Sequence, residues 1–345
     1  MMSNSSFALG LGTGTKNAND EWLEIYFQQP LYAPDQRLMS AMFAIGYEGG
    51  NSTIPLSPAQ MLELAAHLSA TECVDQACLA TALASTDQPL VAVVLEVDTP
   101  PTTVPEGYLK LHLISHRLLK PHQTNLDGLF GVLPNVAWTS EGAISVDELP
   151  TRQLAARLKG EVLEVSSVDK FPKMTNYVVP SGVRIAHTAR VRLGAYLGEG
   201  TTVMHEGFVN FNAGTEGPGM IEGRISAGVM VGAGSDVGGS GSIMGTLSGG
   251  GNLVNSLGDG CLIGANAGTG IPLGDYCTIE AGLYITAGTK VVLLDEHGHE
   301  IETTAARNLA GQSNLLFRRH SITGTVQCLR NRSAIELNDE LHAHN

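Results

Sequence analysis

Residues Ile185–Val209 read IAHTARVRLGAYLGEGTTVMHEGFV, and every sixth position in this stretch is aliphatic. A helix repeats near 3.6 residues and an ordinary strand near 2, so neither produces a period of six. A six-residue repeat with glycines between the aliphatic positions is typical of a parallel β-helix. Each aliphatic side chain then points into a narrow prism and stacks on its counterpart in the preceding coil. The aliphatic residues of this stretch are Ile185, Val191, Leu197, Val203 and Val209.

The same period resumes further along the chain and extends the predicted β-helix to residues 183–292. Two interruptions, Phe211–Met220 and Gly245–Asn255, are expected to leave the prism as loops, because insertions into such a coil project from one face. The 41 glycines suit its corners, where a positive φ or a close backbone approach excludes larger side chains. The further aliphatic positions are Ile225, Val231, Val237, Ile243, Leu257, Ile263, Leu273, Ile279, Ile285 and Val291.

Residues 1–170 lack the six-residue period and instead alternate between helical and strand patterns of hydrophobic residues. They therefore predict a separate N-terminal α/β domain. Ser57 followed by Pro58 is a helix start, because a hydroxyl side chain caps a helix and proline suits its first position. Residues 170–182 are expected to form an extended connector, and residues 293–345 a short strand-and-helix cap with a tail ending in Glu336–Leu341. The other expected helices are Thr71–Leu83, Tyr108–Leu119 and Leu149–Gly160, and the expected strands are Trp22–Phe27, Pro89–Val97 and Val162–Val168.

Composition limits the classes of partner. The 345-residue chain is 43% hydrophobic, which indicates a globular protein long enough for two cores, and its formal net charge is −14. A nucleic-acid or anionic-membrane binder needs a basic face, so the charge argues against both. Small anionic ligands remain compatible, because they need only a local cluster of cations.

The sequence also predicts a cytoplasmic location. No run of about 20 apolar residues is present, so no transmembrane helix is expected. The first residues lack a basic start followed by an apolar stretch and do not predict a secretory signal. The five cysteines are odd in number and scattered, which is typical of reduced thiols in a cytosolic protein.

Several motifs resemble the tetrahydrodipicolinate N-succinyltransferases of bacterial lysine biosynthesis, in the longer form that carries an N-terminal α/β domain. The fold class expected on this basis is a left-handed parallel β-helix of hexapeptide repeats, with the N-terminal α/β domain and a short C-terminal cap. The motifs are MHEGFVNFNAG at Met204–Gly214, IEGRISAGV at Ile221–Val229, GTLSGGGN at Gly245–Asn252, LIGANA at Leu262–Ala267, IEAGLYITAGT at Ile279–Thr289 and NLLFRR at Asn314–Arg319.

The resemblance implies a homotrimer with small-molecule ligands in grooves between neighbouring prisms. It implies transfer of succinyl from succinyl-CoA to the amino group of L-2-amino-6-oxopimelate, the ring-opened form of tetrahydrodipicolinate, on the route to diaminopimelate. Succinyl-CoA would be the acyl donor, and no covalently bound cofactor is expected.

Glu222 is the expected catalytic residue. The resemblance implies that this glutamate acts in catalysis, either by forming an acyl anhydride or as a general base for an amine that is already nucleophilic. Arg224 would point to the same side of an extended backbone and bind a carboxylate through two parallel hydrogen bonds. The alternatives are an exposed corner glutamate and a surface ion pair between Glu222 and Arg224.

Further residues match positions that contact CoA in the family. Small residues suit a groove in which the backbone approaches the pantetheine arm. The arginines of the FRR motif could pair with CoA phosphates, although two adjacent arginines can also form a solvated face. The expected substrate and CoA contacts are Arg224, Gly239, Ser242, Ala265, Glu280, Ala281, Gly288, Lys290, Arg318, Arg319, His320 and Ser321.

Glu206 is the candidate metal ligand. The resemblance places it near the trimer axis, where three copies could hold Mg²⁺, an ion that prefers carboxylate oxygens. The second acidic ligand expected about 17 residues upstream falls at Ala189, however, so this chain departs from the pattern. His205 is a candidate base, as in other hexapeptide acyltransferases, or a structural histidine.

Two other functions stay open. Another CoA-dependent O- or N-acetyltransferase would favour His205 as the base and tolerate loss of Arg224. A non-catalytic β-helix scaffold would make Glu222 and Arg224 incidental. A β-helix carbonic anhydrase is excluded, because it needs three histidines around zinc and the β-helix region supplies only His187 and His205.

Overall fold

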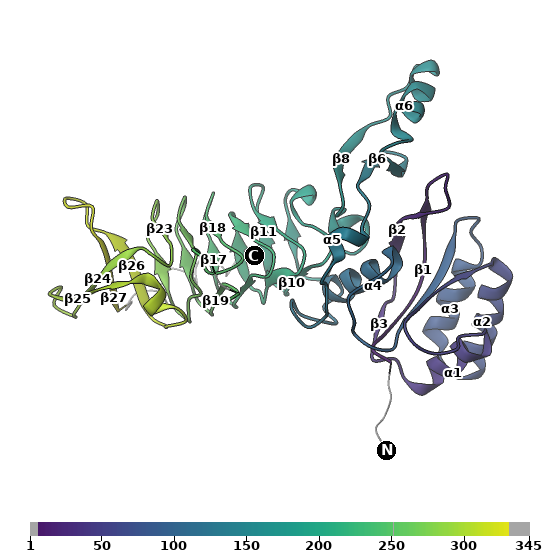
Figure 1. Cartoon of the computed structure of the whole chain (residues 1–345), viewed down its shortest axis with the longest axis horizontal. Coiled ribbons are helices and arrows are strands. Elements are labelled where there is room, and N and C mark those ends of the chain that lie inside the picture. Colours follow the sequence, from purple (N-terminus) through teal and green to yellow (C-terminus); the bar gives the residue numbers. More distant parts are fainter. Residues whose placement is uncertain (1–5, 251, 331–345) are drawn as a thin grey trace. The chain divides into compact units, whose positions relative to one another are not determined.

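The computed structural model describes residues 6–250 and 252–330, and the chain divides into two compact units (Figure 1). The first runs to Leu119 and includes Gln123–Pro172 and Asn176–Val178. The second contains Lys120–His122, Lys173–Thr175 and the chain from Val179 onward. Among the helices of the described residues, none is long and apolar enough to cross a membrane.

The first unit is built on an antiparallel sheet in the order β2-β1-β5-β4, with β3 paired to β1. Leu9 and Leu11 of β1 face a core shared with three helices, whereas Gly10 between them leaves room for Leu109 of a fourth helix on the other side. The strands are β1 Ala8–Lys16, β2 Trp22–Tyr26, β3 Leu31–Tyr32, β4 Ser52–Leu56 and β5 Leu90–Leu95, and the helices are α1 Gln36–Ala44, α2 Pro58–Ala70, α3 Val74–Leu83 and α4 Val104–Ser115.

The expected helix start at Ser57 is confirmed. The Ser57 side chain accepts a hydrogen bond from the Gln60 backbone N–H, and Gln60 accepts one from the Ser57 N–H in return. Helix α4 begins at Val104, before the expected start at Tyr108, because Thr103 caps it by accepting a hydrogen bond from the Glu106 N–H.

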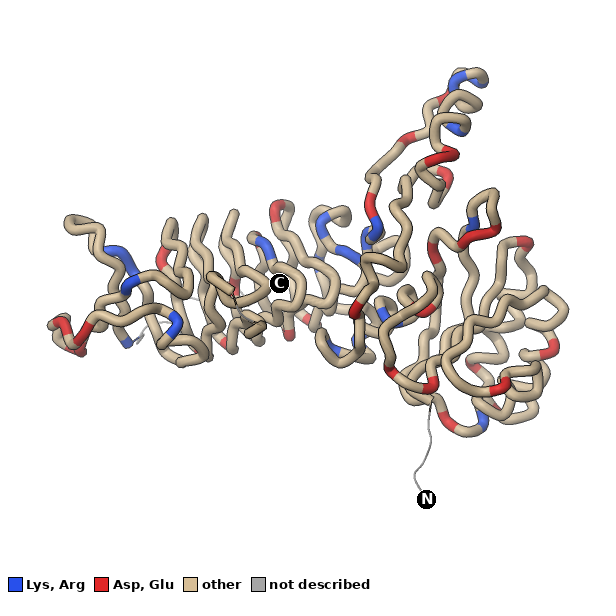
Figure 2. Tube along the Cα trace, viewed as in Figure 1, with Lys and Arg blue, Asp and Glu red and all other residues tan. Residues whose placement is uncertain are grey.

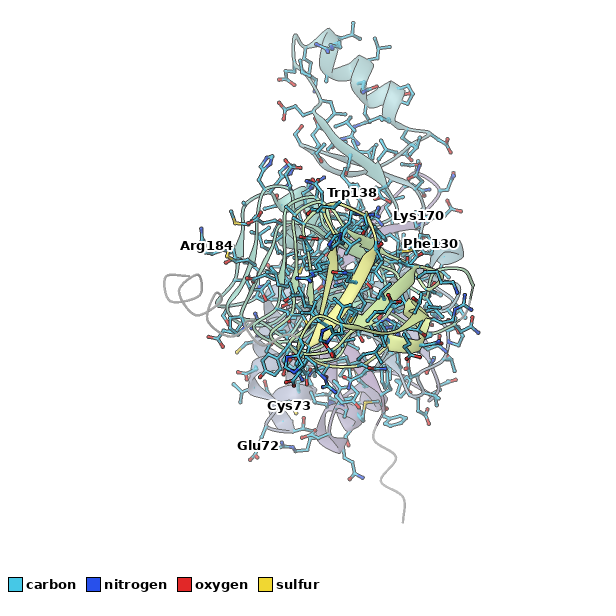
Figure 3. The ribbon with its side chains drawn as sticks, turned by 90° about the vertical axis from the view of Figure 1, so that its left-hand side faces the viewer. Glu72, Cys73, Phe130, Trp138, Lys170 and Arg184 are labelled. Carbon is cyan, nitrogen blue, oxygen red and sulfur yellow. The ribbon has the colours of Figure 1, made fainter. Side chains whose placement is uncertain are left out.

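A second, smaller sheet in the order β7-β6-β8 belongs to the same unit. Trp138 of β6 donates its indole N–H to the Asp169 carbonyl of β8 at 3.0 Å, and Lys170 Nζ donates to the Leu133 carbonyl at 2.5 Å (Figure 3). The elements are α5 Leu129–Val132, β6 Val136–Thr139, β7 Gly142–Ser145, α6 Leu149–Leu158 and β8 Val165–Asp169.

The second unit is the predicted β-helix, whose coils are formed by three parallel sheets (Figure 1). We name each sheet by a strand of the first coils. The β10 sheet contains β10 Ala195–Leu197, β13 Ala213–Thr215, β16 Met230–Val231 and β19 Ser256–Leu257. The β11 sheet contains β9 Arg184–Ile185, β11 Thr201–Val203, β14 Gly219–Ile221, β17 Asp236–Val237, β20 Leu262–Ile263 and β22 Thr278–Ile279. The β12 sheet contains β12 Phe208–Val209, β15 Arg224–Ile225, β18 Ser242–Ile243, β21 Gly268–Thr269 and β23 Tyr284–Ile285.

The six-residue period marks the core, as predicted. In the β11 sheet, Val203 pairs with Ile221, Ile221 with Val237, and Ile263 with Ile279, so these side chains stack in register. All the periodic aliphatic residues are buried except Ile185, which lies half-buried in the first coil.

The expected loop at Phe211–Met220 is wrong. This segment contains β13 and most of β14, and Thr215 and Ile221 continue the inward stacks. The period changes phase afterwards, because only three residues separate Ile221 from Ile225. The expected loop at Gly245–Asn255 does leave the coil: Thr246 and Val254 pair antiparallel, and Asn255 Nδ2 donates to the Met244 carbonyl at 2.7 Å.

The β11 sheet continues past residue 292. Strand β26 pairs in parallel with β22, which places the buried Phe317 on Ile279. The expected cap over 293–345 therefore includes one strand of the β-helix itself, whereas its expected tail lies outside the described residues. The remaining elements are β24 Lys290–Leu294, β25 Glu300–Ala305, the short 3-10 helix Ala306–Leu309, β26 Leu315–Arg319 and β27 Val326–Arg330.

Ile279→Ala should destabilise the β-helix by about 2–5 kcal/mol, because it opens a cavity between Ile263 and Phe317. Chemical denaturation followed by circular dichroism measures the change. The matched control is Ile322→Ala, because Ile322 is 89% exposed and should cost less than about 0.5 kcal/mol. Equal denaturation midpoints for the two variants would contradict the stacking argument.

Candidate active site

On the outer side of the β12 sheet, an arginine side chain is hydrogen-bonded to a serine hydroxyl. Arg224 and Ser242 are partners on the neighbouring strands β15 and β18, and each precedes an inward-facing isoleucine, so both point outward. Ser242 Oγ accepts hydrogen bonds from Arg224 Nε at 3.2 Å and Nη2 at 2.7 Å. This contact leaves the other guanidinium N–H groups able to bind a carboxylate. The alternative of an ion pair between Arg224 and Glu222 is not what the structure shows.

Glu222 lies in the turn between β14 and β15 and is half-buried. Its backbone N–H donates to the Val237 carbonyl at 2.8 Å, which fixes the turn on the following coil. A Cβ atom placed on Gly239 would lie 3.4 Å from Glu222 Oε2, so the carboxylate reaches to van der Waals distance of the space beside Gly239. The structure therefore brings Glu222 and Gly239 together.

The turns that connect the β11 sheet to the β12 sheet form a corner column along the prism. The expected catalytic residue and four of the twelve expected substrate and CoA contacts lie in this column, a neighbourhood that the sequence alone did not show. Three glutamates belong to this column, and they differ in their contacts. The column contains Glu206, Glu222, Gly239, Ala265, Glu280 and Ala281, and the FRR arginines follow at its C-terminal end.

Glu222 is the glutamate of this column whose carboxylate has no protein partner within the described residues. Glu280 Oε2 accepts a hydrogen bond from the Arg319 N–H at 2.7 Å. Glu206 accepts from His205 Nδ1 at 2.8 Å and forms an ion pair with Arg190 at 3.0 Å. A carboxylate without protein donors is available to take a proton or to contact a substrate.

The expected contacts in the FRR segment lie on the β26–β27 hairpin. Arg318 Nε donates to Gln327 Oε1 at 3.1 Å, and Arg319 Nη1 donates to the Gly324 carbonyl at 3.1 Å. Neither guanidinium is paired with a carboxylate in the described part of the chain. His320 Nδ1 accepts from the Thr323 N–H in the hairpin turn, and Ser321 is exposed there.

Two further expected contacts, Gly288 and Lys290, lie on the other side of the β12 sheet from the corner column. Gly288 is exposed between β23 and β24, and Lys290 is the first residue of β24. Both follow the β12 sheet, whereas the corner column precedes it. Arg224 and Ser242 lie on the sheet between these two edges.

The contacts of Glu206 do not fit a magnesium ligand within one chain. Hydrogen bonding by His205 is the main cause that lowers the pKa of Glu206, and the nearby Arg190 guanidinium lowers it further. Both carboxylate oxygens thus face positive or donor groups, and a guanidinium 3.0 Å away would repel a divalent cation. The His187 ring stacks on His205 with centroids 5.1 Å apart. Among the described residues, no group of three or more His, Cys, Asp or Glu is arranged to hold a metal.

Comparison with known proteins decides the family. The family model described as "Tetrahydrodipicolinate N-succinyltransferase middle" matches residues 133–173, and "Hexapeptide repeat of succinyl-transferase" matches residues 254–287. A 2,3,4,5-tetrahydropyridine-2,6-dicarboxylate N-succinyltransferase from Pseudomonas putida is 63% identical over 100% of both chains. The chain belongs to the tetrahydrodipicolinate N-succinyltransferase family.

Two further proteins support the same family assignment. The Vibrio cholerae protein of the same name is 59% identical over 98% of this chain and 99% of its own. A solved structure from Campylobacter jejuni, assigned as a 2,3,4,5-tetrahydropyridine-2-carboxylate N-succinyltransferase, is 31% identical with a TM-score of 0.88. The likeness covers 97% of this chain and 95% of that one. The predicted left-handed β-helix with an N-terminal α/β domain and the predicted family are both confirmed.

Tyr284 is an outward residue of the β12 sheet that the sequence analysis did not single out as a site candidate. It occurs in the motif IEAGLYITAGT, but a single tyrosine carries no signal of its own. Strand pairing places it in the same outward row as Arg224 and Ser242, by way of Gly268. The unequal lengths of the coils hide this row in the sequence.

Removal of divalent cations with EDTA should leave the thermal unfolding temperature unchanged, because Glu206 is already paired with Arg190 and His205. A magnesium ion present at a hundredfold excess over its Kd would stabilise the protein by about 2.7 kcal/mol, which scanning calorimetry detects easily. Glu206→Gln is the matched control and should respond to EDTA in the same way. A fall on EDTA treatment that Mg²⁺ restores, and that Glu206→Gln abolishes, would show that the ion is bound.

Proposed function

We propose that this protein transfers succinyl from succinyl-CoA to the amino group of L-2-amino-6-oxopimelate, the ring-opened form of tetrahydrodipicolinate, on the pathway to diaminopimelate and lysine. The products are N-succinyl-2-amino-6-oxopimelate and free CoA. The observation that carries the proposal is the Arg224–Ser242 pair two positions after Glu222, whose carboxylate has no protein partner within the described residues. Full-length relatives named as 2,3,4,5-tetrahydropyridine-2,6-dicarboxylate N-succinyltransferases support the choice of substrate.

The reaction joins the amine nitrogen to the thioester carbonyl carbon. The C–N bond forms first, the carbonyl oxygen takes the negative charge, and the C–S bond then breaks to release the CoA thiolate. The nitrogen must lose a proton along the way. Glu222 is the general base in this scheme, because its carboxylate has no protein donor in the described residues and a neutral amine needs no covalent activation of the acyl group. Attack by Glu222 on the thioester, to give an acyl anhydride, is the alternative that the same position allows.

Arg224 binds a carboxylate of the succinyl group or of the acceptor. The Ser242 hydroxyl holds its Nε and Nη2, so the guanidinium is fixed in orientation before the substrate arrives. An arginine held in this way favours a four-carbon diacid donor over acetyl-CoA, which has no second carboxylate to pair with it.

CoA lies along the corner column in this proposal. Gly239, Ala265 and Ala281 keep the column narrow, and Arg318 and Arg319 face the phosphates at its C-terminal end. Acidic residues are spread over both units of the chain (Figure 2). The net charge of −14 therefore gives no general attraction for an anionic donor, and local cations must hold it.

The assembly belongs to the same proposal. We infer a cytoplasmic homotrimer that acts on small molecules and binds neither nucleic acid nor membrane. The hexapeptide-repeat match at residues 254–287 supports the trimer, because grooves between prisms are the usual sites of this architecture. The five cysteines are all free thiols, which suits a reducing compartment.

Purified protein should release thiol from succinyl-CoA in a manner that depends on 2-aminopimelate, a stable acceptor. The rate with acetyl-CoA should be lower by about tenfold or more, because one charge-assisted hydrogen-bonded pair is lost. A preference for acetyl-CoA would favour the acetyltransferase alternative. No rate with either donor would favour the scaffold.

Glu222→Gln should lower kcat by a factor of about 10² to 10⁴ with little change in KM, because the amide cannot accept the amine proton. Steady-state kinetics with succinyl-CoA measure the effect. Glu199→Gln is the matched control, since Glu199 is an exposed glutamate in a turn between the β10 and β11 sheets. Full succinyl transfer by the Glu222→Gln protein would overturn the assignment.

A further inference from the structure

An aromatic ring covers a glycine on the face that carries Arg224 and Ser242. The outward row of the β12 sheet runs from Arg224 to Ser242, Gly268 and Tyr284, because these residues are partners on successive parallel strands. A Cβ atom placed on Gly268 would lie 2.3 Å from Cε2 and 2.7 Å from Cδ2 of Tyr284. The ring therefore lies directly over the Gly268 backbone, and any larger residue at position 268 would displace it.

The Tyr284 side chain is available to a ligand. It is 39% exposed although it packs on Gly268, and its hydroxyl forms no hydrogen bond within the described residues. A ring that packs on the backbone with one face and is exposed on the other offers an apolar surface, and a ligand that binds it loses little side-chain conformational entropy. The phenol hydroxyl adds a hydrogen-bond donor and acceptor.

The position of Tyr284 along the prism suits the middle of an extended donor. Neighbouring parallel strands lie about 4.8 Å apart, so the Tyr284 backbone is about 10 Å from Ser242 and about 14 Å from Arg224 along this row. In its own coil, Glu280 accepts the hydrogen bond from the Arg319 N–H, which ties that coil to the basic hairpin. Tyr284 thus lies between the group that would hold the acyl end and the arginines that would face the phosphates.

We propose that Tyr284 binds the pantetheine arm of the acyl donor, a role that rests on the proposed succinyl transfer. The ring contacts the apolar segments of the arm beyond the first amide, and the hydroxyl hydrogen-bonds to the second amide, the one farther from the thioester. Gly268 makes the contact surface, because its missing side chain lets the ring lie close to the strand. Tyr284 therefore fixes the donor at a distance from the reacting thioester and contributes to binding rather than to the chemical step.

The test compares two donors and two variants of Tyr284. Succinyl-CoA carries the whole arm, whereas succinyl-S-N-acetylcysteamine keeps the thioester and the first amide and lacks the rest. Tyr284→Ala should raise KM for succinyl-CoA about 20-fold, and Tyr284→Phe about fivefold, with kcat within about twofold of the unmodified protein. Neither substitution should change kcat/KM for the truncated donor. Calorimetric titration with free CoA should show a similar loss of affinity.

Tyr276→Ala is the matched control. Tyr276 also covers a glycine, with its Cδ1 2.6 Å from a Cβ placed on Gly260, and it is 42% exposed. It lies in a turn between the β10 and β11 sheets, away from the Arg224 row, so KM for succinyl-CoA should stay unchanged.

The outcomes separate the two proposals. An unchanged KM for succinyl-CoA in Tyr284→Ala would overturn the role of Tyr284 while succinyl transfer stands. Equal losses with both donors would also overturn it, because they would show that the ring only supports the fold. If the unmodified protein fails to use succinyl-CoA, the proposed function falls and the donor-arm role falls with it.

Discussion

The in-register stacking of inward aliphatic side chains is the constraint on which the site depends. Each coil must place one buried residue on each sheet directly over its predecessor, as Val203, Ile221 and Val237 do in the β11 sheet. The residue before each inward position is then forced outward. Arg224 and Ser242 become neighbours for this reason alone, although 17 residues lie between them in the chain. The fold creates the rows of the site by repeating one geometric rule.

The short turn after Ile221 gives the site its particular shape. Three residues separate Ile221 from Ile225, whereas five would keep the six-residue period. Glu222 therefore stands in the turn itself, and Arg224 already lies on the next sheet as an outward residue. The turn of the next coil contains Gly239, and the Glu222 carboxylate reaches toward it. The break in the six-residue period therefore places the proposed base and the proposed carboxylate-binding arginine two positions apart, one in the turn and one on the β12 sheet.

The sequence predicts the β-helix well, because its period is visible wherever the inward residues are aliphatic. It fails at Thr215, a polar residue that occupies an inward position because its Oγ1 accepts a hydrogen bond from the Gly217 N–H at 2.9 Å and lies 3.2 Å from Thr201 Oγ1. It also fails at Phe317, which returns to the stack after the excursion of β24 and β25. The candidate site residues could be named one by one from motifs. Their partners could not, since the coils differ in length.

Glu206, Glu222 and Glu280 show how one residue type takes different roles in one column. Glu206 is held by His205 and Arg190, and this contact lowers the pKa of its carboxyl group. Glu280 is held by the Arg319 backbone and fixes the hairpin on its coil. Glu222 has neither kind of partner among the described residues and faces a glycine. A carboxylate that is tied to cations and backbone donors is a poor proton acceptor, because protonation would cost those contacts. Within the described residues, Glu222 is therefore the glutamate of this column best suited to the proposed role of general base, two positions before the arginine that Ser242 of the next coil orients.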